Sequence, residues 1–167
     1  MRTTDPVPGT TFRPALPADA HALRDLERAA NLVALAHVFP PDRYPFPDDA
    51  VLARWYDVLA DPAVEVEVVA GDSGLRCLVA WDPTTLRHLA VHPDHWGNGI
   101  AGEAIRRAVT SIRAHGHEPV LWCLAENTRA RAVYQHLGWG STGRERRAEW
   151  PPYPVEQEHV LRGSGRA

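Results

Sequence analysis

The sequence is poor in cysteine and has no long apolar run. Its two cysteines, Cys77 and Cys123, each lie inside an apolar stretch and show no metal-type spacing. Buried free thiols in a reducing cytoplasm explain this pattern best, so no disulfide framework is expected. No apolar run approaches the ~20 residues needed to cross a membrane. The segment MRTTDPVPGT at the start lacks the apolar stretch of a signal peptide. We therefore expect a cytoplasmic protein with no membrane partner.

Basic charge and metal-binding patterns are also scarce. The net charge of −3 argues against a nucleic-acid partner, because phosphate binding normally needs a basic face. Arg144, Arg146 and Arg147 are a local exception, which we interpret as a solvated turn, with a functional patch as the less favoured alternative. None of the nine histidines belongs to an HExxH pattern, and His92 and His95 flank a Pro-Asp turn. No metal site is expected.

The residues that are present fit one folded domain. A chain of 167 residues, 44% hydrophobic and 23% charged, has a globular composition and is long enough to bury a core. Prolines cluster within residues 40–47 and 151–154, which indicates shaped loops. We expect a single domain over residues 11–162, with flexible termini at 1–10 and 163–167.

Hydrophobic periodicity predicts both helices and strands. Apolar residues recur at helical spacing after Asp19, a suitable N-cap, and again from residue 48 to the stop at Asp61-Pro62. Residues 64–68 alternate valine with glutamate, which is typical of a half-exposed strand. Further strands are expected at 11–13, 75–81, 86–91, 120–124 and 156–161, and further helices at 101–115 and 127–137. This order predicts an α+β (mixed α/β) fold with helices on both faces of one sheet.

A glycine-bearing loop follows the strand at 86–91 and opens the next helix. In Gly97-Asn98-Gly99-Ile100-Ala101-Gly102, the backbone N–H groups at the start of the helix are unpaired and attract anions. Glycine also lets a pyrophosphate approach the main chain closely, since no Cβ intervenes. The alternative is a tight turn that binds nothing.

The same loop satisfies GxGxxG, the dinucleotide-binding fingerprint, and Glu126 stands about where a ribose-binding acid would fall. Two observations count against an NAD(P) site. Five residues separate Val91 from Gly97, whereas a Rossmann turn begins almost at the end of its strand. The pattern also offers a single βαβ unit, so the second mononucleotide-binding half is missing.

Two segments resemble known motifs. Residues 89–101 (LAVHPDHWGNGIA) resemble the acetyl-CoA motif of the GNAT superfamily of N-acetyltransferases. Residues 127–139 (NTRARAVYQHLGW) resemble the second cofactor motif of that superfamily, in the expected order and about 30 residues further on. The family usually has glutamine or arginine where Trp96 stands. The resemblance implies a GNAT-like central mixed, mostly antiparallel sheet, and acetyl-CoA (coenzyme A) as co-substrate.

The resemblance also implies roles for individual residues. The strand before the loop would offer backbone donors to the thioester and pantetheine, the loop would hold the pyrophosphate, and Tyr134 would protonate the departing thiolate. Tyr134 could instead be a core aromatic, and Asn127 a helix N-cap. The expected cofactor-binding residues are Leu89, Ala90, Val91, Trp96, Gly97, Asn98, Gly99, Ile100, Ala101, Gly102, Asn127, Ala130 and Tyr134.

The general base is less clearly indicated. Relatives often place glutamate or histidine on the strand that corresponds to residues 85–91, but Thr85 and Arg87 stand on the expected face here. His88 alternates to the opposite face unless a bulge intervenes. We therefore consider Glu67, on a neighbouring strand, or a chain of water molecules as the base.

These expectations combine into transfer of an acetyl group from acetyl-CoA to a primary amine of a small molecule or peptide, by direct attack in a ternary complex. The loops 37–49 and 144–155 would bind the acceptor through the aromatic residues Phe39, Tyr44 and Trp150, beside the carboxylates of Asp42, Asp48, Asp49 and Glu149. Packing of these aromatics against one another is the alternative. A non-catalytic acyl-CoA-binding module on the same fold stays open, as does a homodimer paired through its closing strands.

Overall fold

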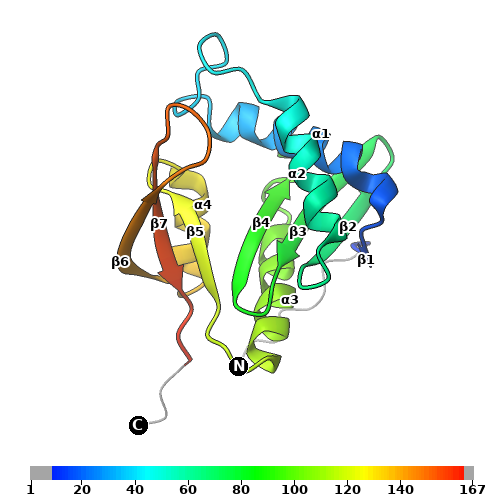
Figure 1. The fold of residues 1–167 in the computed structure, drawn as a ribbon. Helices are drawn as coiled ribbons and strands as arrows, with labels where there is room; N and C mark the ends of the chain where they lie inside the picture. Colours follow the sequence, from blue (N-terminus) through cyan, green and yellow to red (C-terminus); the bar gives the residue numbers. More distant parts are fainter. Residues whose placement is uncertain (1–8, 164–167) are drawn as a thin grey trace.

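The computed structural model describes residues 9–163, so the segments expected to be flexible lie almost entirely outside it (Figure 1). Its α-helices are α1 (Ala20–Ala34), α2 (Asp48–Ala60), α3 (Ile100–Ala114) and α4 (Thr128–His136), and short 3₁₀ turns occupy Pro17–Asp19 and Pro93–His95. Its strands are β1 (Phe12–Pro14), β2 (Glu65–Gly71), β3 (Gly74–Trp81), β4 (Thr85–Val91), β5 (Val120–Leu124), β6 (Gly140–Arg147) and β7 (Val155–Val160). All the expected helices and strands are present, together with one strand that the sequence did not predict.

The strands form one sheet in the order β1-β2-β3-β4-β5-β7-β6. Neighbouring strands are antiparallel except β4 and β5, which run parallel. Helices α1 and α2 cover one face of β2–β4, and α3 covers the other (Figure 1). This confirms the predicted α+β fold with a mixed, mostly antiparallel sheet and helices on both faces. It also excludes a doubly wound dinucleotide-binding fold, which needs several adjacent parallel strands.

Strand alternation divides the apolar core into two clusters. On β3, Cys77 and Val79 point toward α3, whereas Leu78 and Ala80 point toward α1 and α2. Each fully buried aliphatic side chain stabilises the fold by about 1.5–3 kcal/mol relative to its exposed state. Packing on both faces therefore holds the central strands in place, and one of them, β4, contributes to the cavities described below.

The sheet opens between β4 and β5, and we call this opening the seam. The two strands are in register at Thr85↔Val120 and Leu86↔Leu121, and the ladder between them ends there. Residues 88–91 of β4 continue to pair with β3 on their other side. Apart from the Val91 carbonyl, which accepts a hydrogen bond from Trp96 Nε1, the backbone groups of β4 that face β5 beyond Leu86 can bind something other than a strand.

Strand β6 corrects the interpretation of residues 144–147 as a solvated turn. It pairs with β7 through Arg146↔Glu156 and Arg147↔Val155, and the ion pair between Arg146 Nε and Glu156 measures 2.6 Å. Nearly all of its residues are exposed, and β6 is an edge strand of the sheet. Such a strand has no apolar alternation for sequence analysis to detect. Since β7 lies between β5 and β6, the closing strand has no open edge through which it could pair with another subunit.

Candidate active site

The loop before α3 is shaped by two glycines. Gly97 and Gly99 have φ angles of +82° and +80°, in the left-handed region that glycine adopts without strain. Gly99 is the N-cap of α3, and the N–H groups of the first turn that follows are open to a ligand. At the other end of the loop, the His92 side chain accepts a hydrogen bond from the Asp94 backbone N–H at 3.2 Å. The chain thus presents a helix N-terminus directly beside the seam.

A cavity of about 560 Å³ lies against this helix start, and we call it the loop cavity. Four elements contribute to its wall: α1, the end of β4, the loop with the first turn of α3, and α4. Of the expected cofactor-binding residues, all but Asn98 line it: Leu89, Ala90, Val91, Trp96, Gly97, Gly99, Ile100, Ala101, Gly102, Asn127, Ala130 and Tyr134. The two motif segments are therefore brought together around one space.

Trp96 stabilises the loop through two contacts. Its indole Nε1 donates a hydrogen bond to the Val91 carbonyl at 2.8 Å, which ties the loop to the end of β4. The guanidinium of Arg129 stacks on the indole, 3.8 Å from the ring centroid. Arg129 also lines the loop cavity. The positive charge of Arg129 thus lies beside Trp96, at the position where the family usually has a polar side chain. Sequence reasoning missed Arg129, although it lies inside the second motif.

Asn127 and Ala130 fulfil a structural role at the start of α4. The Asn127 side chain accepts a hydrogen bond from the Ala130 N–H at 3.1 Å, which confirms the predicted N-cap. Both residues line the loop cavity at the same time. The cap therefore fixes the direction in which α4 leaves the seam and, with it, the position of Tyr134 about two turns later.

Tyr134 lies between two cavities. It is 8% exposed, packs edge-on against Trp139 at a centroid distance of 5.8 Å, and lines both the loop cavity and a smaller cavity of about 220 Å³ inside the seam. Burial, with a smaller contribution from Cys123, raises the pKa of the phenol well above its usual value. The hydroxyl consequently stays protonated at neutral pH and can donate a proton. Tyr134 is thus a core aromatic whose surroundings also suit an acid.

The smaller cavity, which we call the seam cavity, contains a histidine. His88 pairs with Ala80 in the regular register of β3 and β4, before the register shift at Trp81, and its ring lies 5.0 Å from that of Trp55 on α2. His88 faces α2 as expected, yet this face lines the seam cavity. Burial, together with Arg54 and Arg87, lowers the pKa of His88 to about 3. The imidazole is therefore neutral at neutral pH. It can accept a hydrogen bond, but it does not keep a second proton.

Glu67, which the sequence suggested as a base, lies elsewhere. It stands opposite Val79 on the α3 face of the sheet, and both of its carboxylate oxygens bind Arg107, one of them at 3.0 Å. It lines none of the three cavities described here. Its side chain is engaged in a structural ion pair, and we no longer consider it as the base.

A third cavity, of about 470 Å³, contains the three aromatics expected to bind the acceptor. Phe39, Tyr44 and Trp150 all line it, and we call it the aromatic cavity. It shares Glu27 and Asn31 of α1 with the seam cavity, and Asn31 also lines the loop cavity. The three spaces therefore adjoin one another along one face of α1.

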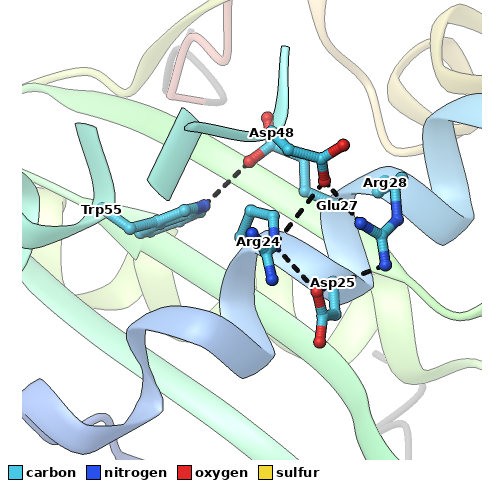
Figure 2. A network of polar contacts seen from close by, with 6 residues as sticks. All are labelled: Arg24, Asp25, Glu27, Arg28, Asp48 and Trp55. Atoms are coloured by element: carbon cyan, nitrogen blue, oxygen red, sulfur yellow. Dashed lines mark hydrogen bonds and ion pairs between the residues drawn. The ribbon is translucent and has the colours of Figure 1, made fainter. Parts of the chain in front are cut away.

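Glu27 is a second residue that sequence reasoning missed. Its Oε2 accepts a hydrogen bond from Arg54. The same oxygen accepts a second one from Trp55 Nε1, at 2.9 Å (Figure 2). Its side chain is only 16% exposed. No motif marks this position, because a glutamate on an amphipathic helix is an ordinary surface residue. Only the packing of α1 over the seam gives it a place in the site.

The sequence matches the Acetyltransferase (GNAT) family over residues 32–139, which is more than half of the chain. The chain belongs to this family of acetyltransferases. The matched region includes the glycine loop, the seam and all of α4, and it ends at Trp139. No curated protein matches the sequence.

Solved structures share the fold at low sequence identity. A GCN5-related N-acetyltransferase from Rhodopseudomonas palustris superposes with a TM-score of 0.70 at 16% identity, over 90% of this chain and 93% of its own. YncA from Salmonella typhimurium, solved with acetyl-CoA, gives 0.67 at 19% identity, over 95% and 96%. A variant of spermidine N-acetyltransferase SpeG from Vibrio cholerae gives 0.62 at 21% identity, over 90% and 94%.

Residues 9–163 show neither a cluster of metal-binding side chains nor a membrane-spanning helix. This part of the chain contains no group of three or more histidine, cysteine, aspartate or glutamate side chains that could hold a metal ion. It also contains no helix long and apolar enough to span a bilayer.

Proposed function

We propose that the protein transfers the acetyl group of acetyl-CoA to a primary amine of a small molecule or peptide, by direct attack in a ternary complex. The observation that carries this proposal is the continuity of the three cavities. The loop and seam cavities share Tyr134 and Asn31, and the seam and aromatic cavities share Glu27 and Asn31. A donor in the first and an acceptor in the last can therefore meet in the seam without a covalent enzyme intermediate.

The loop cavity suits coenzyme A. Its helix N-terminus and the left-handed glycines provide backbone N–H donors for a pyrophosphate, and Arg129 adds a positive charge. A Cβ at Gly102 would meet no atom within 4 Å, so the main chain there is open to close approach. Residues 87–90 make no ladder with β5, so their backbone groups on that side would pair with the amides of pantetheine. The acetyl-CoA complex of YncA, which has the same fold, supports this assignment.

Tyr134 would act as the acid. A primary amine arrives as an ammonium ion, so its nitrogen loses one proton before attack and a second as the N–C bond forms, and a chain of water molecules would carry them to solvent. The C–S bond breaks in the same step, and the sulfur gains one proton. Tyr134 lines both the loop and the seam cavity and its hydroxyl remains protonated, so it can supply the proton to the sulfur. His88 would only accept a hydrogen bond, because its pKa of about 3 prevents it from keeping the proton of the amine.

Release of free thiol from acetyl-CoA, followed with a thiol reagent over a panel of amines, tests the proposal. The chain suits this assay, since both of its cysteines are buried and burial raises their pKa values, that of Cys77 to about 12 and that of Cys123 to about 11. The sequence contains no lysine, so its own side chains offer no competing amine. Amine-dependent thiol release would support acetyl transfer. Thermal stabilisation by acetyl-CoA without any such release would leave the non-catalytic binding module as the explanation.

A further inference from the structure

The aromatic cavity carries very little charge. Its wall is formed mainly by apolar and aromatic side chains, among them Phe39, Tyr44, Phe46, Val51 and Trp150. Among residues 9–163, only one carboxylate, that of Glu27, and one cationic side chain, that of Arg43, line it. A ligand in this cavity can thus pair one positive charge with the Glu27 carboxylate, and the remainder of the ligand must be apolar.

The other carboxylates near this cavity do not line it. Asp42, Asp48, Asp49 and Glu149, expected from the sequence to attract cations, are all absent from its wall. Asp48 is engaged in a surface network, where its Oδ1 binds Arg28 at 2.5 Å and Arg24 at 3.7 Å (Figure 2). These acids are therefore not available as a row of sites for a polycation.

Glu27 has one oxygen to offer. Both of its hydrogen bonds within the described residues are made by Oε2, while Oε1 accepts none. Because Trp55 and Arg54 hold Oε2, the carboxylate is fixed in orientation before a ligand arrives. Glu27 lines both the aromatic cavity and the seam cavity, so a group bound to Oε1 lies on the path toward Tyr134 and His88.

We propose, building on the acetyl transfer proposed above, that the acceptor is a monoamine with an uncharged apolar group of about aromatic size. Its ammonium binds Glu27 Oε1 where the aromatic and seam cavities meet, and its apolar group fills the aromatic cavity. Polyamines are poor acceptors, since a second ammonium in this cavity would find no second carboxylate and would face Arg43. Burying an unpaired charge is costly, so the cavity selects against it.

Three probes of graded charge test this proposal: 2-phenylethylamine, spermidine and the uncharged 2-phenylethanol. For the wild-type protein with acetyl-CoA, kcat/KM measured by thiol release should be at least about tenfold higher for 2-phenylethylamine than for spermidine. Binding without acetyl-CoA, followed by tryptophan emission, should be seen for the amine and not for the alcohol. Glu27→Gln should raise KM and Kd for 2-phenylethylamine by about 10- to 100-fold, the loss expected for a hydrogen bond to a charged group.

Asp25→Asn provides the matched control. It removes the same charge from the same helix, but Asp25 binds Arg24 and Arg28 outside the three cavities, so KM for the amine should stay unchanged. An unaltered thermal shift with acetyl-CoA shows that Glu27→Gln still folds, and Glu27→Asp should recover part of the affinity. A preference for spermidine, or equal KM values for Glu27→Gln and wild type, would overturn the monoamine assignment while leaving acetyl transfer intact. Absence of thiol release with every amine would overturn both.

Discussion

Replacing Gly102 by leucine should stabilise the free protein and at the same time abolish its binding of acetyl-CoA. Gly102 is the third residue of α3, and no other atom lies within 4 Å of the position that a Cβ would take. Leucine favours helix over glycine, and because the site is in the first turn the gain is about 0.5 kcal/mol. The new side chain would stand in the wall of the loop cavity, where the pyrophosphate should approach the main chain.

Thermal melting with and without ligand measures both effects. A gain of about 0.5 kcal/mol raises the Tm of a domain of this size by about 1–2 °C. For the wild type, acetyl-CoA at 100 times its Kd adds ~2.7 kcal/mol of stability, or about 5–10 °C. The leucine variant should melt slightly above the free wild type and show no shift with acetyl-CoA.

Gly140→Ala is the control for this experiment. A Cβ at Gly140 on β6 also meets no atom within 4 Å, and the residue lines none of the three cavities. This variant should keep the full shift with acetyl-CoA. If Gly102→Leu melts normally and still gains the wild-type shift, the cofactor does not lie against the start of α3, and our assignment of the loop cavity is refuted.

Three further predictions concern single side chains. Tyr134→Phe should lower kcat by ~10²-fold or more while the acetyl-CoA KM changes little, and an unchanged kcat would reduce Tyr134 to a packing residue. His88 has an ordinary pKa of 6.5 and a folded pKa of about 3, so its neutral form contributes stability that is fully present above pH 6.5 and is lost as the pH falls toward 3. Relative to His88→Gln, the wild type should lose roughly 3 kcal/mol more in free energy of unfolding between pH 7 and pH 4.5, measured by urea titration at each pH, and parallel pH profiles would contradict the buried neutral imidazole. Glu67→Gln should leave kcat and both KM values unchanged and lower stability by no more than about 1 kcal/mol, because its partner Arg107 is 40% exposed; a large fall in kcat would restore Glu67 as a catalytic candidate.

The sequence was informative wherever local physics determines structure. Asn127 was predicted as an N-cap from its place before a helical pattern, and its side chain does cap α4. The glycines at 97 and 99 were expected to open a helix, and both adopt the left-handed conformation there. Twelve of the thirteen expected cofactor-binding residues line one cavity, because they come from two short motifs that each form a single continuous surface.

Features that depend on distant packing could not be predicted in this way. Strand β6 is polar on both faces, so nothing in its pattern distinguishes it from a turn; its pairing with β7 defines it. Glu27 and His88 belong to unremarkable stretches of a helix and a strand, and they lie on one cavity only because α1 crosses the seam. Glu67 was attractive from its strand neighbourhood alone, but the alternation of β2 turns it toward α3 and Arg107.

The seam also divides the molecule into two halves that can separate locally. The glycine loop and Glu27 belong to the half built on β1–β4, whereas Asn127 and Tyr134 belong to the half built on β5–β7. These halves are joined by two register pairs between β4 and β5 and by a hydrogen bond of 2.7 Å from His37 Nε2 to the Glu126 carbonyl. They also share the apolar core under α3, in which Leu121 of β5 belongs to the same cluster as Leu86 of β4. The loop cavity is lined by residues of both halves, so a molecule bound there contacts both and stabilises their arrangement. Without a ligand, we expect unfolding by force or denaturant to begin at the seam. With a ligand in the loop cavity, we expect the two halves to unfold together.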